Sequence, residues 1–178
     1  MRKHEEFLRK FVRYRQKMGK KLGDITPLLD DTNAFRKAIK LMSKTFKNDK
    51  IDKVVGIEAR GFIFGCAVSM ELNCGFVPIR KENKLIFPVF RKDFINYRGK
   101  REYMEIHKDA IKKGENVLIV DDWLETGESI NAAIDLIEKT GGRIKGISVF
   151  YDCSLPETRK KKFSKYVLQA VIRSHKQP

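Results

Sequence analysis

The sequence lacks a long apolar run and has few cysteines. No stretch approaches the run of about 18 apolar residues that a membrane-spanning helix requires, and no apolar core follows the polar residues 1–6. We therefore expect a cytosolic protein that contacts no membrane. The three cysteines are widely spaced and do not match a metal-ligand pattern, so we expect buried free thiols. Internal repeats are absent as well, and 178 residues predict one domain.

The positive charge is concentrated at the two ends of the chain. The formal net charge is +15, of which residues 1–21 carry +7 and residues 157–178 carry +6. Basic ends can bind nucleic acid, but neither end contains a nucleic-acid-binding motif. A solvated lysine-rich surface is the favoured interpretation, and nucleic acid is the less favoured partner. Apolar side chains at helical spacing predict a basic helical segment within residues 1–22: Phe7, Leu8, Phe11, Val12 and Met18.

One stretch, Val117–Ile130, combines a strand, two carboxylates and a turn. Residues 117–120 are all apolar, which is typical of a parallel strand covered on both faces. Asp121 and Asp122 follow at its carboxyl end, where ligands bind in open α/β sheets. The turn Glu125–Ser129 then leads into a helical pattern. Its backbone N–H groups and the helix N-terminus are expected to form an anion site.

A similar unit occurs earlier in the chain. Residues 53–57 indicate a strand that opens into the turn Glu58–Gly61, and a helical pattern follows before another strand at residues 76–79. Repetition of this order predicts an α/β fold with a mostly parallel central sheet flanked by helices. Arg80, Lys81 and Lys84 follow the second strand, so we expect them at the sheet edge that also holds Arg60 and the two aspartates.

Residues 85–104 form the longest stretch without a clear period. Aromatic residues alternate there with arginines and lysines, a composition that can stack the bases of single-stranded nucleic acid. A flexible lid over the substrate or a β-ribbon explains the same composition and is favoured, because long excursions within compact domains are usually functional loops.

These features together predict one kind of ligand. It carries a monophosphate for the turn 125–129, vicinal hydroxyls for the two aspartates, and a magnesium-bound polyphosphate for the cations. Carboxylates accept hydrogen bonds from ribose hydroxyls and balance Mg²⁺, directly or through the ligand. Arginine and lysine hold polyphosphate.

Four further stretches occur in a fixed order along the chain. They read Asp-Ile-Thr-Pro-Leu-Leu at 24–29, Glu-Ala-Arg-Gly-Phe-Ile-Phe-Gly at 58–65, Ile-Arg-Lys-Glu-Asn-Lys-Leu at 79–85, and Glu-Ile-His-Lys-Asp-Ala-Ile at 105–111. With the acidic pair, they make the chain resemble the type I phosphoribosyltransferases, most closely the adenine phosphoribosyltransferase family.

The resemblance implies transfer of ribose 5-phosphate from phosphoribosyl pyrophosphate to a purine base, with adenine as the leading base, Mg²⁺ as cofactor and a homodimer as the usual assembly. It implies a single domain over residues 1–178 with a lid at 85–104, and a cis peptide bond in the turn Glu58–Gly61. The catalytic residues implied are Asp121, Asp122, Glu125 and Tyr97, and the aspartates also face the metal. The substrate-binding residues implied are Ala59, Arg60, Gly61, Arg80, Lys81, Lys84, Glu125, Thr126, Gly127, Glu128, Ser129, Leu22 and Asp24.

The sequence departs from the family pattern in the phosphate loop, the lid, the base pocket and the residue after the acidic pair. The usual Ala-Thr-Gly-Gly-Thr is replaced by Glu125–Ser129, which places two acids in a loop that binds a dianion. The acid that usually precedes the lid tyrosine is Asn96, and residues 20–23 lack the usual aromatic and arginine. Trp123 replaces a common aliphatic residue and is expected to fill core space.

The departures leave two alternatives to adenine transfer. An acid at the position of Glu125 also occurs in 6-oxopurine phosphoribosyltransferases, where it approaches the purine, so the base would be hypoxanthine, guanine or xanthine. The other alternative is a non-catalytic regulator that binds phosphoribosyl pyrophosphate or a nucleotide.

Overall fold

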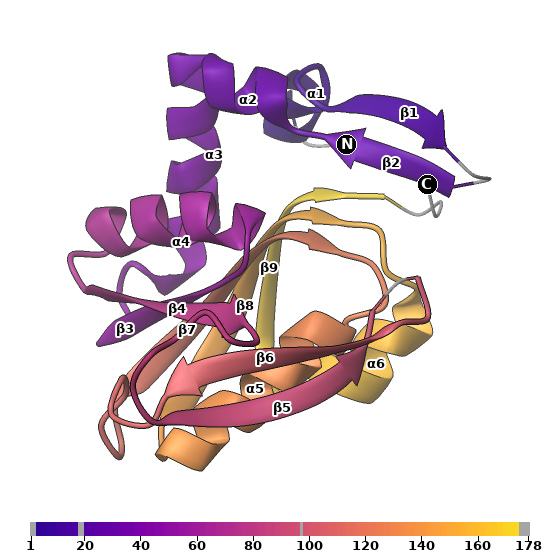
Figure 1. Cartoon of the computed structure of the whole chain (residues 1–178). Helices are drawn as coiled ribbons and strands as arrows, with labels where there is room; N and C mark the ends of the chain where they lie inside the picture. Colours follow the sequence, from indigo (N-terminus) through magenta and orange to yellow (C-terminus); the bar gives the residue numbers. More distant parts are fainter. Residues whose placement is uncertain (1–2, 18–19, 97, 175–178) are drawn as a thin grey trace.

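The computed structural model describes residues 3–17, 20–96 and 98–174, and a seven-stranded sheet forms their centre (Figure 1). The strand order is β5-β6-β4-β3-β7-β8-β9. The neighbouring parallel strands are β4 (Gly75–Lys81), β3 (Lys53–Ile57), β7 (Asn116–Leu124), β8 (Arg143–Asp152) and β9 (Val167–Arg173). The predicted α/β fold with a mostly parallel sheet is therefore confirmed.

Helices cover both faces of this sheet, which explains why its central strands are apolar on both sides. Helices α3 (Thr32–Ser43) and α4 (Arg60–Glu71) pack on one face, and α5 (Glu128–Thr140) packs on the other. The side chains of residues 117–120 are all fully buried between them. Short helices α2 (Thr26–Asp30) and η1 (Lys44–Phe46) flank α3.

Residues 85–104 contribute to a two-stranded ribbon. Strands β5 (Val89–Ile95) and β6 (Arg101–His107) pair antiparallel, and β6 joins the end of β4 through the pairs Arg80↔Glu105 and Lys81↔Met104. Of the two favoured interpretations of this stretch, the structure has the ribbon. Closure of the ribbon over a substrate stays a prediction.

The expected helical segment over residues 1–22 is wrong beyond Arg9. Helix α1 covers only Lys3–Arg9, and strands β1 (Arg13–Lys17) and β2 (Lys20–Asp24) form a separate hairpin. Residues 13–17 contain three basic side chains and no aliphatic one, which does not continue the apolar face of α1, and strand pairing satisfies the backbone there instead. Met18 lies outside the described residues.

Strand β7 is longer than its apolar run predicts. It continues through Asp121 and Asp122 to Leu124, and it remains paired with β8 through Trp123↔Tyr151 and Leu124↔Asp152. The two aspartates therefore belong to the strand and share its rigidity, whereas the turn begins only after Leu124.

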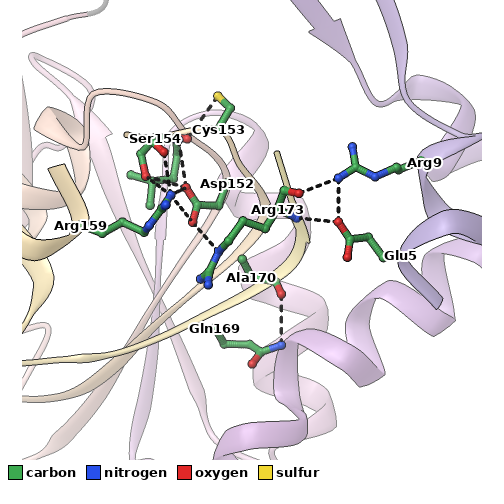
Figure 2. A network of polar contacts seen from close by, with 10 residues as sticks. Glu5, Arg9, Asp152, Cys153, Ser154, Arg159, Gln169, Ala170 and Arg173 are labelled. Carbon is green, nitrogen blue, oxygen red and sulfur yellow. Dashed lines mark hydrogen bonds and ion pairs between the residues drawn. The ribbon is translucent and has the colours of Figure 1, made fainter. Parts of the chain in front are cut away.

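The C-terminal helix α6 (Pro156–Phe163) is held by a buried carboxylate at the end of β8. Asp152 is fully buried, and both of its oxygens accept hydrogen bonds from Arg159 of α6 at 3.2 Å (Figure 2). The guanidinium of Arg173 in β9 donates to the same carboxylate at 3.1 Å, and the backbone N–H of Arg173 donates to Glu5 of α1. This network connects α6 and α1 to the edge of the sheet.

The cysteine prediction holds only in part. The three thiols are free, but only Cys153 is buried, whereas Cys74 is half-buried and Cys66 is exposed. Among the described residues, none of the helices is both long and apolar enough to cross a membrane.

Candidate functional site

A pocket of about 420 Å³ opens at the carboxyl ends of β3 and β7, between the ribbon β5–β6 and the hairpin β1–β2. Most of the residues that the sequence analysis assigned to substrate binding or catalysis line it. They are Ala59, Arg60, Lys81, Asp121, Asp122, Glu125, Thr126, Gly127 and Ser129.

The carboxylate pair lies at the base of this pocket. Asp121 and Asp122 are only 7% and 6% exposed, and the backbone N–H of Asp122 donates to Asp121 Oδ1 at 2.9 Å. Gly61 of α4 allows this arrangement, because a Cβ at this position would lie 2.7 Å from Asp121 Oδ1. Arg60 Nε lies 2.9 Å from Asp122 Oδ2. Among the described residues, however, no donor is aligned for a hydrogen bond to that oxygen.

Burial of the pair disfavours ionisation. The pKa of Asp121 is raised well above its ordinary value, first by burial and then by the neighbouring charge of Asp122. The pKa of Asp122 is also raised by burial, although the guanidinium of Arg60 opposes the shift. A negative charge on the pair is therefore costly, and hydroxyl donors or a cation would stabilise it.

The turn after β7 has the geometry of an anion site. Gly127 has a left-handed φ of 76° and is the N-cap of α5 without a capping side chain, and the N–H of Glu128 donates only a long hydrogen bond of 3.5 Å to Thr126 Oγ1. Free N–H groups at a helix N-terminus attract anions. Glu125 lines the pocket, whereas the carboxylate of Glu128 forms an ion pair with Lys162 of α6 and is not part of the lining.

The cations are arranged in two groups. Arg60 lies beside the carboxylate pair and donates to the carbonyl of Gly23 at 3.1 Å, and Lys81 Nζ lies 3.2 Å from Glu102 on the ribbon. Arg80 and Lys84 do not line the pocket, and Arg80 Nε instead donates to Glu58 Oε2 at 3.0 Å.

Glu58 organises the turn between β3 and α4. Its carboxylate also accepts the N–H of Lys81 at 2.8 Å. Burial opposes ionisation, but the Lys81 N–H and the Arg80 guanidinium together lower the pKa of Glu58. The peptide bond between Glu58 and Ala59 is cis, as the resemblance implies.

The hairpin covers the pocket through a contact with Trp123. A Cβ on Gly23 of β2 would overlap the indole ring, so only glycine allows this approach. The indole stacks on Tyr151 with ring centroids 4.1 Å apart, and its Nε1 donates to Cys153 Sγ at 3.1 Å. Trp123 therefore lines the pocket and packs against the hairpin as well as against the core.

Like Arg80, Lys84 and Glu128, Asp24 does not line the pocket. The Asp24 carboxylate accepts the N–H and the hydroxyl of Thr26, at 2.9 and 2.6 Å, and these bonds lower the pKa of Asp24. Leu22 belongs to β2, where its backbone pairs with Arg15, but its side chain lies outside the described part of the structure. Tyr97 lies outside the described residues altogether.

The sequence analysis missed the ribbon's contribution to the pocket. Alternate residues of the paired strands line it, as strand alternation would have indicated, together with two residues of the ribbon tip. The additional lining residues are Phe94, Asn96, Arg98, Glu102 and Met104. Asn96 organises the ribbon tip, because its amide oxygen accepts the N–H groups of Arg98 and Lys100 and its Nδ2 donates to Glu102 at 2.6 Å.

The donor set suits a magnesium ion that arrives with its substrate. No group of three or more acidic, histidine or cysteine side chains positioned to hold a metal occurs in the described part of the chain. Mg²⁺ commonly binds through one or two carboxylates together with substrate phosphates. Asp121 and the unsatisfied Oδ2 of Asp122 fit that arrangement.

Comparison with known proteins identifies the family. Residues 24–178 match the model of the phosphoribosyl transferase domain. The chain belongs to the phosphoribosyltransferase family.

Individual phosphoribosyltransferases are similar to this chain over most of their length. The chain is 39% identical over 169 residues to an adenine phosphoribosyltransferase of Brachyspira hyodysenteriae, covering 94% of this chain and 97% of the relative. It is 49% identical over 128 residues to the one from Christiangramia forsetii, covering 72% and 74%. The solved structure of the Rhodothermus marinus enzyme superposes with a TM-score of 0.88 at 34% identity, covering 96% and 98%. The Giardia lamblia enzyme complexed with 9-deazaadenine superposes with a TM-score of 0.88 at 32% identity, covering 94% and 96%.

The raised pKa of Asp121 predicts that this phosphoribosyltransferase is less stable with the carboxylate than with an amide. Asp121→Asn should raise the unfolding free energy at pH 7 by about 1 kcal/mol. A carboxyl group whose pKa is higher in the folded than in the unfolded state destabilises the folded protein increasingly as the pH rises from the unfolded pKa to the folded one. The stability gained by Asp121→Asn should therefore shrink as the pH falls toward about 4.

Urea denaturation between these pH values measures the effect, and the exposed Asp49→Asn provides the same change of charge without burial. A loss of stability in Asp121→Asn at pH 7, or a gain independent of pH, would contradict the assignment of a costly buried charge.

Proposed function

We propose that this phosphoribosyltransferase transfers the ribose 5-phosphate group of phosphoribosyl pyrophosphate to adenine and releases pyrophosphate. One observation carries the proposal: an anion-binding turn, a buried carboxylate pair and a group of cations line a single pocket. These features match in order the phosphate, the ribose and the pyrophosphate of this substrate. The names of the relatives support adenine as the base, because similar proteins are adenine phosphoribosyltransferases.

The substrate would lie along the carboxyl edge of the sheet. The 5-phosphate would accept N–H groups of the turn 125–129 and the first turn of α5. The ribose hydroxyls would donate hydrogen bonds to the carboxylate pair. One of these hydroxyls would be the donor for the unsatisfied Asp122 Oδ2. The pyrophosphate would lie near Arg60, Lys81 and the N–H groups of Ala59 and Gly61, with Arg80 and Lys84 adding positive charge nearby.

The reaction exchanges one bond at the ribose C1 for another. The C1–O bond to pyrophosphate breaks and its electron pair leaves with the pyrophosphate, while a ring nitrogen of the base forms the new bond to C1 and loses its proton. Arg60 and Lys81 stabilise the growing negative charge on the leaving group, and the carboxylate pair stabilises the electron-poor ribose. Bound Mg²⁺, held through the pyrophosphate and the carboxylates, would add charge neutralisation. Closure of the ribbon, which carries Tyr97, would exclude water from the activated sugar.

Glu125 is the proposed acceptor of the proton or the group that orients the base. It is half-buried, follows β7 directly and lines the pocket. The same position favours the second candidate function, in which a 6-oxopurine replaces adenine. The homodimer implied by the resemblance stays a prediction.

A panel of bases tests the proposal. Purified protein with Mg²⁺ and phosphoribosyl pyrophosphate should release pyrophosphate with adenine, and Asp122→Asn should reduce this rate at least about 100-fold because the amide removes the negative charge and replaces one acceptor oxygen with a donor. Faster turnover with hypoxanthine, guanine or xanthine would establish the second candidate. Binding of phosphoribosyl pyrophosphate without turnover of any base would contradict the enzyme and indicate a regulator.

A variant of Glu125 separates catalysis from loop structure. Glu125→Ala should lower kcat for adenine by about 100-fold, the usual contribution of a general base, and leave the affinity for phosphoribosyl pyrophosphate unchanged. Steady-state kinetics and calorimetric binding measure the two quantities. Loss of affinity at unchanged kcat would place Glu125 in the structure of the loop.

A further inference from the structure

Helix α6 contacts the phosphate loop through two consecutive residues. Lys162 Nζ donates to the carbonyl of Thr126 at 3.1 Å and forms an ion pair with the carboxylate of Glu128. Phe163 is buried against Gly127, where a Cβ would lie 2.7 Å from its ring. The loop 125–129 is therefore supported from outside the pocket by a segment more than thirty residues later in the chain.

The end of α6 that holds Lys162 has a fixed position, because the start of the helix is anchored. Arg159 donates to the buried Asp152, and also to the carbonyl of Ser154 at 2.6 Å (Figure 2). Asp152 pairs in the sheet with Leu124, the residue directly before the loop. The anchor of α6 and the start of the loop therefore share one strand pair, which places Lys162 beside Thr126 and Glu128.

Glu128 creates an electrostatic conflict in this loop. It is the first residue of α5, and the N–H groups of a first helical turn attract any nearby carboxylate. A carboxylate at that place would compete with a bound phosphate and repel its charge. The side chain of Glu128 is 40% exposed and that of Lys162 is 21% exposed, and their ion pair lies outside the lining of the pocket.

We propose that Lys162 is a positioning residue of the 5-phosphate subsite, which it keeps open by holding the Glu128 carboxylate outside the loop. Its hydrogen bond also fixes the Thr126 carbonyl away from the ligand, which leaves the N–H groups of the loop directed inward. The inference rests on the proposed function, since it assigns a role within the subsite for the ribose 5-phosphate group. It explains how the loop can bind a dianion although Glu128 occupies the first position of α5.

Four variants and one ligand test this role. Ribose 5-phosphate binding, measured by calorimetry at about 0.15 M salt, avoids any dependence on turnover. Lys162→Met should raise its Kd roughly tenfold, because the released carboxylate enters the loop. Lys162→Arg should stay near the parent value, and Glu128→Gln should bind more tightly than the parent. The double variant Lys162→Met with Glu128→Gln should recover the affinity lost in Lys162→Met.

The matched control is Lys161→Met, which removes the same charge from an exposed position of α6 and should leave Kd unchanged. If the ion pair only stabilised the structure of the loop, then Lys162→Met, Glu128→Gln and the double variant would all weaken binding equally. That pattern would overturn the inference. Failure of the wild-type protein to bind ribose 5-phosphate would overturn the proposed function and the inference with it. If Lys162→Met does not fold, weaker binding by Glu128→Gln than by the parent overturns the inference by itself.

Discussion

Burial of two adjacent carboxylates at the end of β7 is the constraint on which the site depends. Charge in that position is unfavourable, and its pKa values are raised accordingly. The surroundings compensate only in part: Gly61 allows α4 to approach, and Arg60 supplies one cation. An Asp122 oxygen that is buried without a hydrogen bond is costly in the free protein and favourable once a ligand hydroxyl reaches it. The buried carboxylates therefore lower the stability of the folded protein and favour binding of a ligand with hydroxyl groups.

The phosphate loop also contains an unfavourable carboxylate that a neighbouring cation compensates. Glu128 would oppose a dianion, yet it pairs with Lys162 from α6, and α6 is anchored by Asp152 at the end of β8. The same carboxylate binds Arg173, whose backbone N–H reaches Glu5 of α1. The basic C-terminal segment therefore has a structural role in addition to its effect on net charge.

The sequence predicts the parallel sheet and the acidic pair because each depends on local pattern, such as the four apolar residues before Asp121. The N-terminal hairpin escapes prediction, since residues 13–17 are mostly charged and have no helical or strand period that decides between the two. Trp123 follows two aspartates at the end of an apolar run, and its contact with Gly23 of the distant hairpin is not encoded in that local pattern. The pair of Glu128 with Lys162 is a tertiary contact between distant segments, which no local pattern encodes.

Proton release on binding tests the central claim most directly. Calorimetric titration with a preformed complex of Mg²⁺ and phosphoribosyl pyrophosphate, in buffers of different ionisation enthalpy between about pH 5 and 7, measures it. The account predicts that the protein releases more protons than Asp121→Asn does, because ligand hydroxyls and cations lower the raised pKa values of the pair. Equal release by both proteins would contradict it.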